Sequence, residues 1–271
     1  MTYVLIGCGN LGEIILNGFY LKKKKISVVE KNDKVNSKIS SKYKRIKTFS
    51  NFKEINWLEI RYIMICVKPK DCKKILNEIK EFQLDKHIFV SFVAGLSTSG
   101  IKKCLGSRSK VVRIMPNILI SSNNSATAVY MMGFEKNLKS KILKDFSHFG
   151  ILVEVNQEKK IDFFTAMFGG GPAYIFSILE IFNEIIKNNG FSEKESLLLL
   201  TSLVEGVEKR IKKDSFNFKL SINQVASKGG TTEEALKVFS KKNILSSLIN
   251  KAIRVATLKS IKISKDLDKL F

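Results

Sequence analysis

The chain has 271 residues, of which 47 are Lys or Arg and 25 are Asp or Glu, so its formal net charge is +22. With 44% hydrophobic residues and only 3 prolines it can bury a sizeable core, which excludes a disordered tail or a low-complexity linker. No apolar run reaches about 18 residues and no charged segment precedes an apolar one at the start, so we expect a cytoplasmic protein without a membrane span or secretory signal.

The basic charge does not indicate a nucleic-acid-binding protein. Lysine supplies 41 of the basic residues and arginine only 6. Surfaces that read bases or clamp phosphates favour the bidentate arginine fork, so this composition argues against nucleic acid as a partner. The excess is concentrated in residues 1–155, which hold 28 basic and 12 acidic groups and would attract an anionic cofactor or substrate.

Metal ligands are scarce. The 4 cysteines and 2 histidines fit no CxxC or Cys/His ligand spacing. We therefore expect no metal site and no disulfide framework.

Residues 1–155 alternate short apolar runs with amphipathic segments, the first of which is 11–21. Such alternation is typical of an α/β fold with buried parallel strands, and it predicts an N-terminal Rossmann-type dinucleotide-binding domain. Strands are expected at 3–6, 26–30, 62–67, 87–93 and 111–115.

Residues 156–271 show helical spacing of apolar side chains and predict a C-terminal all-helical domain for dimerisation. Gly190 ends one helix, and Ser192 is placed to cap the next. The segment 197–200 is four consecutive leucines, so the helix 197–211 is apolar around most of its circumference. A small domain cannot bury such a helix by itself, which predicts that a second subunit covers it.

A glycine-rich loop lies between the first strand and the first helix, and it consists of Gly7, Cys8, Gly9, Asn10, Leu11 and Gly12. In this position the first glycine permits a tight turn, the second lets the backbone approach a pyrophosphate, and the third allows close packing of helix on sheet. The anion is then held at the helix N-terminus. The loop therefore predicts a dinucleotide site, and a glycine turn without a ligand is the alternative.

Glu30 ends the second expected strand. An acid at this place accepts hydrogen bonds from the ribose hydroxyls of NAD and repels the 2′-phosphate of NADP. The adjacent Lys31 partly offsets that repulsion. A solvated glutamate at a strand end is the alternative.

Three further motifs stand at the carboxyl ends of apolar runs, where open α/β sheets bind ligands, namely 66–69, 91–95 and 113–117. Strand termination by proline explains any one of them, but three on one edge favour a binding site. The helical part adds two segments, 165–174 and 227–232, that place glycines or hydroxyls at helix starts and suit a carboxylate. For the second, an ordinary turn with Thr231 or Thr232 as the N-cap remains the alternative.

Together these motifs resemble pyrroline-5-carboxylate reductases over essentially the whole chain. Residues 6–12 resemble the cofactor loop of that family, and the other matching motifs are Val67-Lys68-Pro69, Met115-Pro116-Asn117, Gly169 to Tyr174 (GSGPAY in the family) and Ser227 to Thr232 (SPGGTT in the family). Two departures stand out, because Gly170 replaces a serine and Lys228 replaces a proline. The second makes a stiff turn more flexible and more positive.

The resemblance implies reduction of 1-pyrroline-5-carboxylate to L-proline by a reduced nicotinamide cofactor, NADH or NADPH, in an obligate dimer. It implies that Gly230, Thr231 and Thr232 hold the substrate with Glu158 nearby, and that Thr232 bonds the ring nitrogen. It implies cofactor contacts from the loop 7–12 and from Lys68, Pro69, Ala94 and Gly95.

Two alternatives stay open. Another NAD(P)-dependent imine or β-hydroxyacid oxidoreductase would share both domains, but such enzymes use a Lys or Asp on the interdomain helix, where this chain has phenylalanines around Thr165. A nucleotide-sensing or nucleic-acid-binding protein could also retain the fold, and it would lack imine reductase activity.

Overall fold

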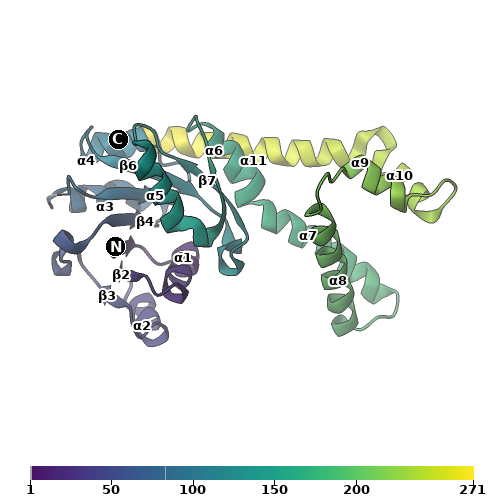
Figure 1. Cartoon of the computed structure of the whole chain (residues 1–271), viewed down its shortest axis with the longest axis horizontal. Coiled ribbons are helices and arrows are strands. Elements are labelled where there is room, and N and C mark those ends of the chain that lie inside the picture. Colours follow the sequence, from purple (N-terminus) through teal and green to yellow (C-terminus); the bar gives the residue numbers. More distant parts are fainter. Residues whose placement is uncertain (1, 83) are drawn as a thin grey trace. The chain divides into compact units, whose positions relative to one another are not determined.

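The computed structural model describes residues 2–82 and 84–271 of the chain (Figure 1). The chain forms two compact units. One comprises Met1–Pro172 together with Val255–Phe271, and the other comprises Ala173–Arg254. Each unit is described by itself.

The first unit is built on an eight-stranded sheet in the order β3-β2-β1-β4-β5-β6-β7-β8. Its strands are β1 (Thr2–Ile6), β2 (Lys25–Val29), β3 (Lys47–Phe49), β4 (Tyr62–Ile65), β5 (Ile88–Ser91), β6 (Lys110–Met115), β7 (Ser125–Tyr130) and β8 (Gly150–Glu154). The five strands predicted from apolar runs are confirmed, and the short β3 and the pair β7 and β8 are additions.

Strand directions make this sheet a dinucleotide-binding type. All neighbours from β3 to β6 are parallel, whereas β7 runs antiparallel to β6 and β8 runs parallel to β7. The strand order reverses between β1 and β4, because the chain first moves outward to β3 and then returns to the other side of β1. Open α/β sheets bind ligands at such a reversal, beyond the carboxyl ends of the strands.

Helices cover both faces of the sheet, which gives a three-layer α/β/α unit. The helices of this unit are α1 (Asn10–Leu21), α2 (Asp33–Lys42), α3 (Cys72–Lys80), α4 (Thr98–Leu105), α5 (Lys136–Phe146), α6 (Lys160–Phe164) and the C-terminal turns of α11 (Ile244–Asp268), with short turns η1 (Phe52–Glu54), η2 (Trp57–Glu59), η3 (Pro69–Asp71), η4 (Ile118–Ser122), η5 (Ser147–Phe149) and η6 (Thr165–Gly169). Helices α1, α2 and α5 pack on the face that carries Tyr3 and Leu5. The other face, with Val4 and Ile6, receives α3, α4 and Leu267 of α11.

The second unit is entirely helical within the described residues. It contains α7 (Gly171–Asn188), α8 (Glu193–Ile211), α9 (Phe218–Val225), α10 (Thr231–Ser240), η7 (Lys241–Asn243) and the start of α11. The predicted cap of α8 is confirmed, because the Ser192 side chain accepts from the Glu195 N–H while the Glu195 carboxylate accepts from the Ser192 N–H. This reciprocal pair satisfies two otherwise unbonded N–H groups at the helix start.

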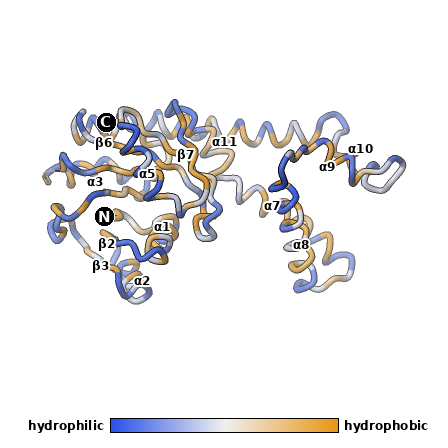
Figure 2. Tube along the Cα trace, in the orientation of Figure 1, coloured by the Kyte–Doolittle hydropathy of each residue, from blue (hydrophilic) through white to orange (hydrophobic). Residues whose placement is uncertain are grey.

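Helices α7 and α8 leave most of their apolar side chains exposed. In α8, Leu198 is 70% exposed and Leu203 is 52% exposed, whereas Leu200 is buried. Apolar residues recur along both helices in Figure 2. The continuous helical segment 160–188 is also long and apolar enough to cross a bilayer by length and composition alone, with 17% of its apolar window buried. One such helix is weak evidence of a membrane span, and an uncovered subunit interface has the same composition.

The compact units do not divide at the predicted boundary between residues 155 and 156. Helix α6 and the last turns of α11 belong to the sheet unit, where Ile161 and Leu267 are buried. Helical periodicity alone places these segments with the other helices, but their apolar side chains are buried against the sheet unit.

Candidate active site

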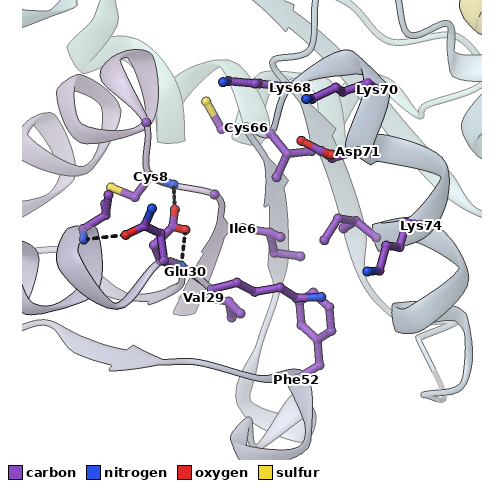
Figure 3. Close-up of a pocket in the computed structure, with 17 residues that line it drawn as sticks. Ile6, Cys8, Val29, Glu30, Phe52, Cys66, Lys68, Lys70, Asp71 and Lys74 are labelled. Carbon is purple, nitrogen blue, oxygen red and sulfur yellow. Dashed lines mark hydrogen bonds between the residues drawn. The ribbon is translucent and has the colours of Figure 1, made fainter.

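A cleft of about 530 Å³ opens where the strand order reverses (Figure 3). Its walls come mainly from the segments that follow β1, β2 and β4. The lining residues are Ile6, Gly7, Cys8, Gly9, Val29, Glu30, Lys31, Asn32, Val35, Phe52, Cys66, Val67, Lys68, Lys70, Asp71, Lys74 and Ile75. Five of the residues predicted to bind a cofactor therefore share one cleft, namely Gly7, Cys8, Gly9, Glu30 and Lys68.

The glycine loop has the geometry that its sequence predicts. Gly7 has φ +84°, and a Cβ there would lie 2.6 Å from Cγ1 of Val67 and 2.9 Å from the carbonyl oxygen of Cys66. At Gly12 a Cβ would lie 2.6 Å from the carbonyl oxygen of Gly7, whereas at Gly9 it would meet no atom within 4 Å. Gly7 and Gly12 therefore allow close packing of strand, loop and helix, and Gly9 leaves the backbone open to a ligand.

The first turn of α1 offers hydrogen-bond donors to that ligand. Asn10, Leu11 and Gly12 begin this turn directly after Gly9, which lines the cleft and is the N-cap without any side chain to accept from them. A helix N-terminus with such uncapped N–H groups and a positive dipole end favours an anion such as a pyrophosphate.

Glu30 connects the end of β2 to the glycine loop. One carboxylate oxygen accepts the Cys8 N–H over 2.8 Å and the other accepts the Asn32 N–H over 2.9 Å. Figure 3 shows the carboxylate lying against the loop. In a Rossmann-type site, an acid at this position contacts the ribose of the adenosine. The Glu30 carboxylate also stabilises the glycine loop through its hydrogen bond from Cys8.

Lysines surround the same cleft, and sequence reasoning singled out only Lys31 and Lys68. Lys70 and Lys74 also line it. The Lys31 ammonium pairs with Glu78 over 2.7 Å, so part of its charge is offset by that carboxylate. Lys70 and Lys74 follow Lys68 by two and six residues, and this closeness to the strand-end motif is the signal that could have identified them.

Two thiols of this region, those of Cys8 and Cys66, have a raised pKa. Burial, followed by the Glu30 and Glu13 charges, raises the pKa of Cys8 to about 12. Burial also raises the pKa of Cys66 to about 12. Among the described residues, no group of three or more His, Cys, Asp or Glu side chains could hold a metal ion.

Other predicted cofactor residues lie at strand ends outside the lining of this cleft. Pro69 begins η3 directly after Lys68. Ala94 and Gly95 follow β5, which is two strands from β1 on the β4 side. Glu30 follows β2, which is on the other side of β1. Ala94 and Gly95 therefore lie farther from Glu30 along the sheet edge than the glycine loop does.

Glu158 is held by donors of its own unit. Its carboxylate accepts the Thr98 N–H over 2.8 Å and the Thr98 hydroxyl over 2.7 Å, and it pairs with Nη1 of Arg113 over 3.2 Å. The Arg113 side chain is only 3% exposed. Glu158 thus links the start of α4 to β6, and it is not the freely solvated charge that its sequence context would otherwise suggest.

The strand-end motif at 115–117 has a structural role in this unit. Asn117 is buried, and its side-chain amide donates to the carbonyl oxygen of Phe168 over 2.8 Å. Phe168 belongs to η6, a π-helical turn between α6 and α7. Single π-helical turns are frequent at functional sites.

In the helical unit, the predicted substrate residues share the start of α10. Gly230 is the N-cap, and Thr231 and Thr232 are the first two helical residues. The alternative in which Thr231 or Thr232 caps the helix is therefore wrong, because Gly230 has the extended backbone of the cap. Glu233 instead accepts the Gly229 N–H over 2.7 Å and closes the preceding turn.

Two family models match separate parts of the chain. Residues 158–263 match pyrroline-5-carboxylate reductase dimerisation, and residues 2–95 match NADP oxidoreductase coenzyme F420-dependent. The chain is 29% identical to a pyrroline-5-carboxylate reductase of Aquifex aeolicus, over 89% of this chain and 90% of that protein. It is 26% identical to the enzyme of the same name from Staphylococcus saprophyticus, over 97% and 98% of the two chains.

Solved structures agree over nearly the full length. A pyrroline-5-carboxylate reductase structure from Coxiella burnetii has a TM-score of 0.83 at 27% identity and covers 97% of this chain and 98% of its own. A Plasmodium falciparum pyrroline carboxylate reductase structure with NADP bound has a TM-score of 0.86 at 23% identity, with the same coverage, and shows the shared fold. The dimerisation model, the full-length relatives and the fold agree, so this chain is related over its length to the pyrroline-5-carboxylate reductases.

Proposed function

We propose that this chain reduces 1-pyrroline-5-carboxylate to L-proline by hydride transfer from a reduced nicotinamide cofactor, the last step of proline biosynthesis. The single observation that carries the proposal is the similarity over about nine tenths or more of both chains to reductases of that name. The dinucleotide cleft at the strand reversal supports it independently.

The residues of the sheet unit fit a dinucleotide. The uncapped start of α1 suits the pyrophosphate, and Gly9 leaves room for its approach. Glu30 is at the ribose position, and Lys68 lines the same cleft. Pro69, Ala94 and Gly95 continue the same sheet edge and are proposed to complete the cofactor site. The bound cofactor supplies the hydride.

The substrate requires little chemical activation. A protonated cyclic imine is already electrophilic at its carbon, so hydride addition there leaves the nitrogen as a neutral amine without an acid or a metal. The protein then contributes mainly alignment and binding of the carboxylate.

Gly230, Thr231 and Thr232 are the proposed substrate residues. They form the start of α10, whose N–H groups and dipole favour a carboxylate, and Thr232 is the proposed hydrogen-bond partner of the ring nitrogen. We propose that Glu158 acts on the site indirectly, because Thr98 and Arg113 already occupy its carboxylate.

The finer features are proposals of the same kind. NADH is slightly favoured over NADPH, because Glu30 would repel a 2′-phosphate while Lys31 is partly neutralised by Glu78. The uncovered apolar sides of α7 and α8 pack against a second copy of the chain, and the enzyme works in the cytoplasm as a homodimer or a larger homo-oligomer.

The test is oxidation of NADH and of NADPH, followed by absorbance, with the cyclic imine carboxylate as substrate and L-proline identified as product. Acyclic imines and β-hydroxyacids serve as competing substrates. Turnover of those compounds without turnover of the cyclic imine would support the alternative oxidoreductase. Nucleotide binding without any turnover would support a sensing protein.

A further inference from the structure

The short loop between β5 and α4 is in direct contact with the C-terminal turns of α11. Gly95 has φ +82°, and a Cβ there would lie 2.6 Å from Cγ2 of Ile263 and 3.1 Å from the backbone nitrogen of Ser264. Two backbones therefore approach closely at Gly95, and a small displacement of α11 would move the loop.

The same loop has a second tie to α11. The Ser97 hydroxyl donates to a carboxylate oxygen of Asp268 over 2.6 Å, while its oxygen accepts the Gly100 N–H over 3.0 Å as the N-cap of α4. Residues 95 and 97 are thus both fixed by the last turns of one helix.

Asp162 of α6 holds this helix in place. One of its carboxylate oxygens accepts the Ser260 hydroxyl over 2.7 Å and the Ser264 hydroxyl over 3.2 Å. Asp162 and Ser260 are buried. Because Ser260 and Ser264 are four residues apart on one helical face, a single acceptor between them fixes both the rotation and the axial position of α11.

Asp162 does not line the cofactor cleft, and among the described residues no Lys, Arg or His forms a salt bridge with it. A buried carboxylate is costly unless hydrogen bonds compensate, and here two serine hydroxyls provide them. This buried carboxyl group therefore has its side-chain hydrogen bonds to the helix that touches Gly95.

We propose that Asp162 is a positioning residue for hydride transfer. Through Ser260 and Ser264 it sets the place of α11, and through Ile263 and Ser264 that helix sets the place of the Ala94–Gly95 loop. The inference rests on the proposed function, in which Ala94 and Gly95 complete the cofactor site. Because they follow β5, on the part of the sheet edge farther from Glu30, this loop is assigned to the nicotinamide half of the cofactor. The pyrophosphate loop and Glu30 are on other elements, so Asp162 governs alignment more than cofactor affinity.

The test compares Asp162→Ala with Asp162→Asn in the full-length protein. The alanine variant is expected to lose about tenfold in kcat while the Kd of NADH, measured by fluorescence, changes less than about threefold. The isotope effect with 4-deuterated cofactor should rise, because hydride transfer becomes more rate-limiting. Asparagine keeps an oxygen that accepts from both serines, so it should restore kcat to within about threefold of wild type.

Hydrogen exchange supplies a readout that needs no turnover. In Asp162→Ala, amides of residues 94–97 should exchange faster, while those of α1 should not. Asp162→Asn should leave both segments close to wild type. This arm tests the inference even when the wild-type protein does not reduce the cyclic imine, a result that would refute the proposed function alone.

Tyr62→Phe is the matched control. It removes a 2.7 Å hydrogen bond, from Tyr62 to Asp145, on the opposite face of the sheet. If it and Asp162→Ala lower kcat and the melting temperature equally, Asp162 serves stability only and the inference fails.

Ser260→Ala is the replacement variant if Asp162→Ala does not fold, because it removes one hydrogen bond of Asp162 and leaves the bond to Ser264. It should likewise lower kcat with little change in the Kd of NADH, and amides of residues 94–97 should again exchange faster while those of α1 do not. Unchanged kcat in that variant would also overturn the inference.

Discussion

The Glu30 carboxylate accepts the backbone N–H of Cys8 over 2.8 Å, which joins the end of the second strand to the glycine loop across 22 residues of sequence. The acid that would contact the cofactor ribose therefore also supports the loop that would hold the pyrophosphate. Substitutions at Glu30 change charge and loop geometry together, and the two effects must be separated by the choice of variant.

We predict that the wild-type enzyme prefers NADH over NADPH by about tenfold in kcat/KM, because repulsion between Glu30 and a 2′-phosphate is screened near the surface. Glu30→Ser should narrow or reverse the preference. Glu30→Gln is the control, since its amide oxygen still accepts from Cys8 while the charge is lost. Steady-state kinetics with both cofactors provide the measurement, and a wild-type preference for NADPH would show that Glu30 does not select the ribose.

Thr232→Ala is expected to lower turnover by about ten- to one-hundredfold with nearly unchanged cofactor affinity. Loss of one hydrogen bond to a charged group costs about 1.5 to 3 kcal/mol, which corresponds to this range. Since Gly230 and not Thr232 caps α10, the substitution removes no cap and the melting temperature should change little. Thr232→Ser keeps the hydroxyl and serves as the control. Wild-type kinetics in the alanine variant would remove Thr232 from the site.

The chain is predicted to be at least a dimer and not to persist as a folded monomer. Leu197, Leu198 and Leu203 are each about half exposed or more on α8, and contiguous apolar surface of this kind marks an obligate interface. Light scattering at micromolar concentration should give a dimeric or larger mass. Leu198→Asp should lower that mass or the melting temperature, whereas Lys209→Glu on the same helix should not. A stable monomer of the wild type would contradict the prediction.

His148 should make folding stability depend on pH. Burial, and after it the positive charges of Lys24 and Lys22, lower the pKa of His148 to about 4. Asp145 acts in the opposite direction but does not offset this lowering. The folded state therefore binds fewer protons than the unfolded state between about pH 6.5 and 4, so stability is complete above pH 6.5 and falls as the pH drops through this window. The loss attributable to this one group is at most about 3 kcal/mol.

Denaturant unfolding of wild type and His148→Phe between pH 4 and 8, at one protein concentration, tests this. The variant keeps a ring against Phe19 and Phe149, whose centroids lie 4.6 and 4.8 Å from that of the imidazole. Other acids titrate in both proteins, so the difference between them isolates His148. Parallel pH profiles would show that His148 does not contribute.

The sequence alone determined the features that depend on neighbouring residues. Buried parallel strands appear as short apolar runs, and the glycines of residues 7–12 follow one of them at the spacing that a phosphate-binding turn requires. The Ser192 cap and the apolar excess of α8 are likewise local patterns. The resemblance to family motifs adds Gly230, Thr231 and Thr232 as expected substrate residues. Their residue types alone are equally compatible with an ordinary turn at a helix start.

Tertiary structure decided the contacts between residues far apart in the chain. Periodicity cannot show that the last turns of α11 return to the sheet, because the pairing of Asp162 with Ser260 spans 98 residues. It cannot show that Lys70 and Lys74 share a cleft with Glu30, or that Arg113 and Thr98 occupy the Glu158 carboxylate. Hydrophobic spacing states which side of an element is buried, but the element that buries it is chosen by packing of the whole chain.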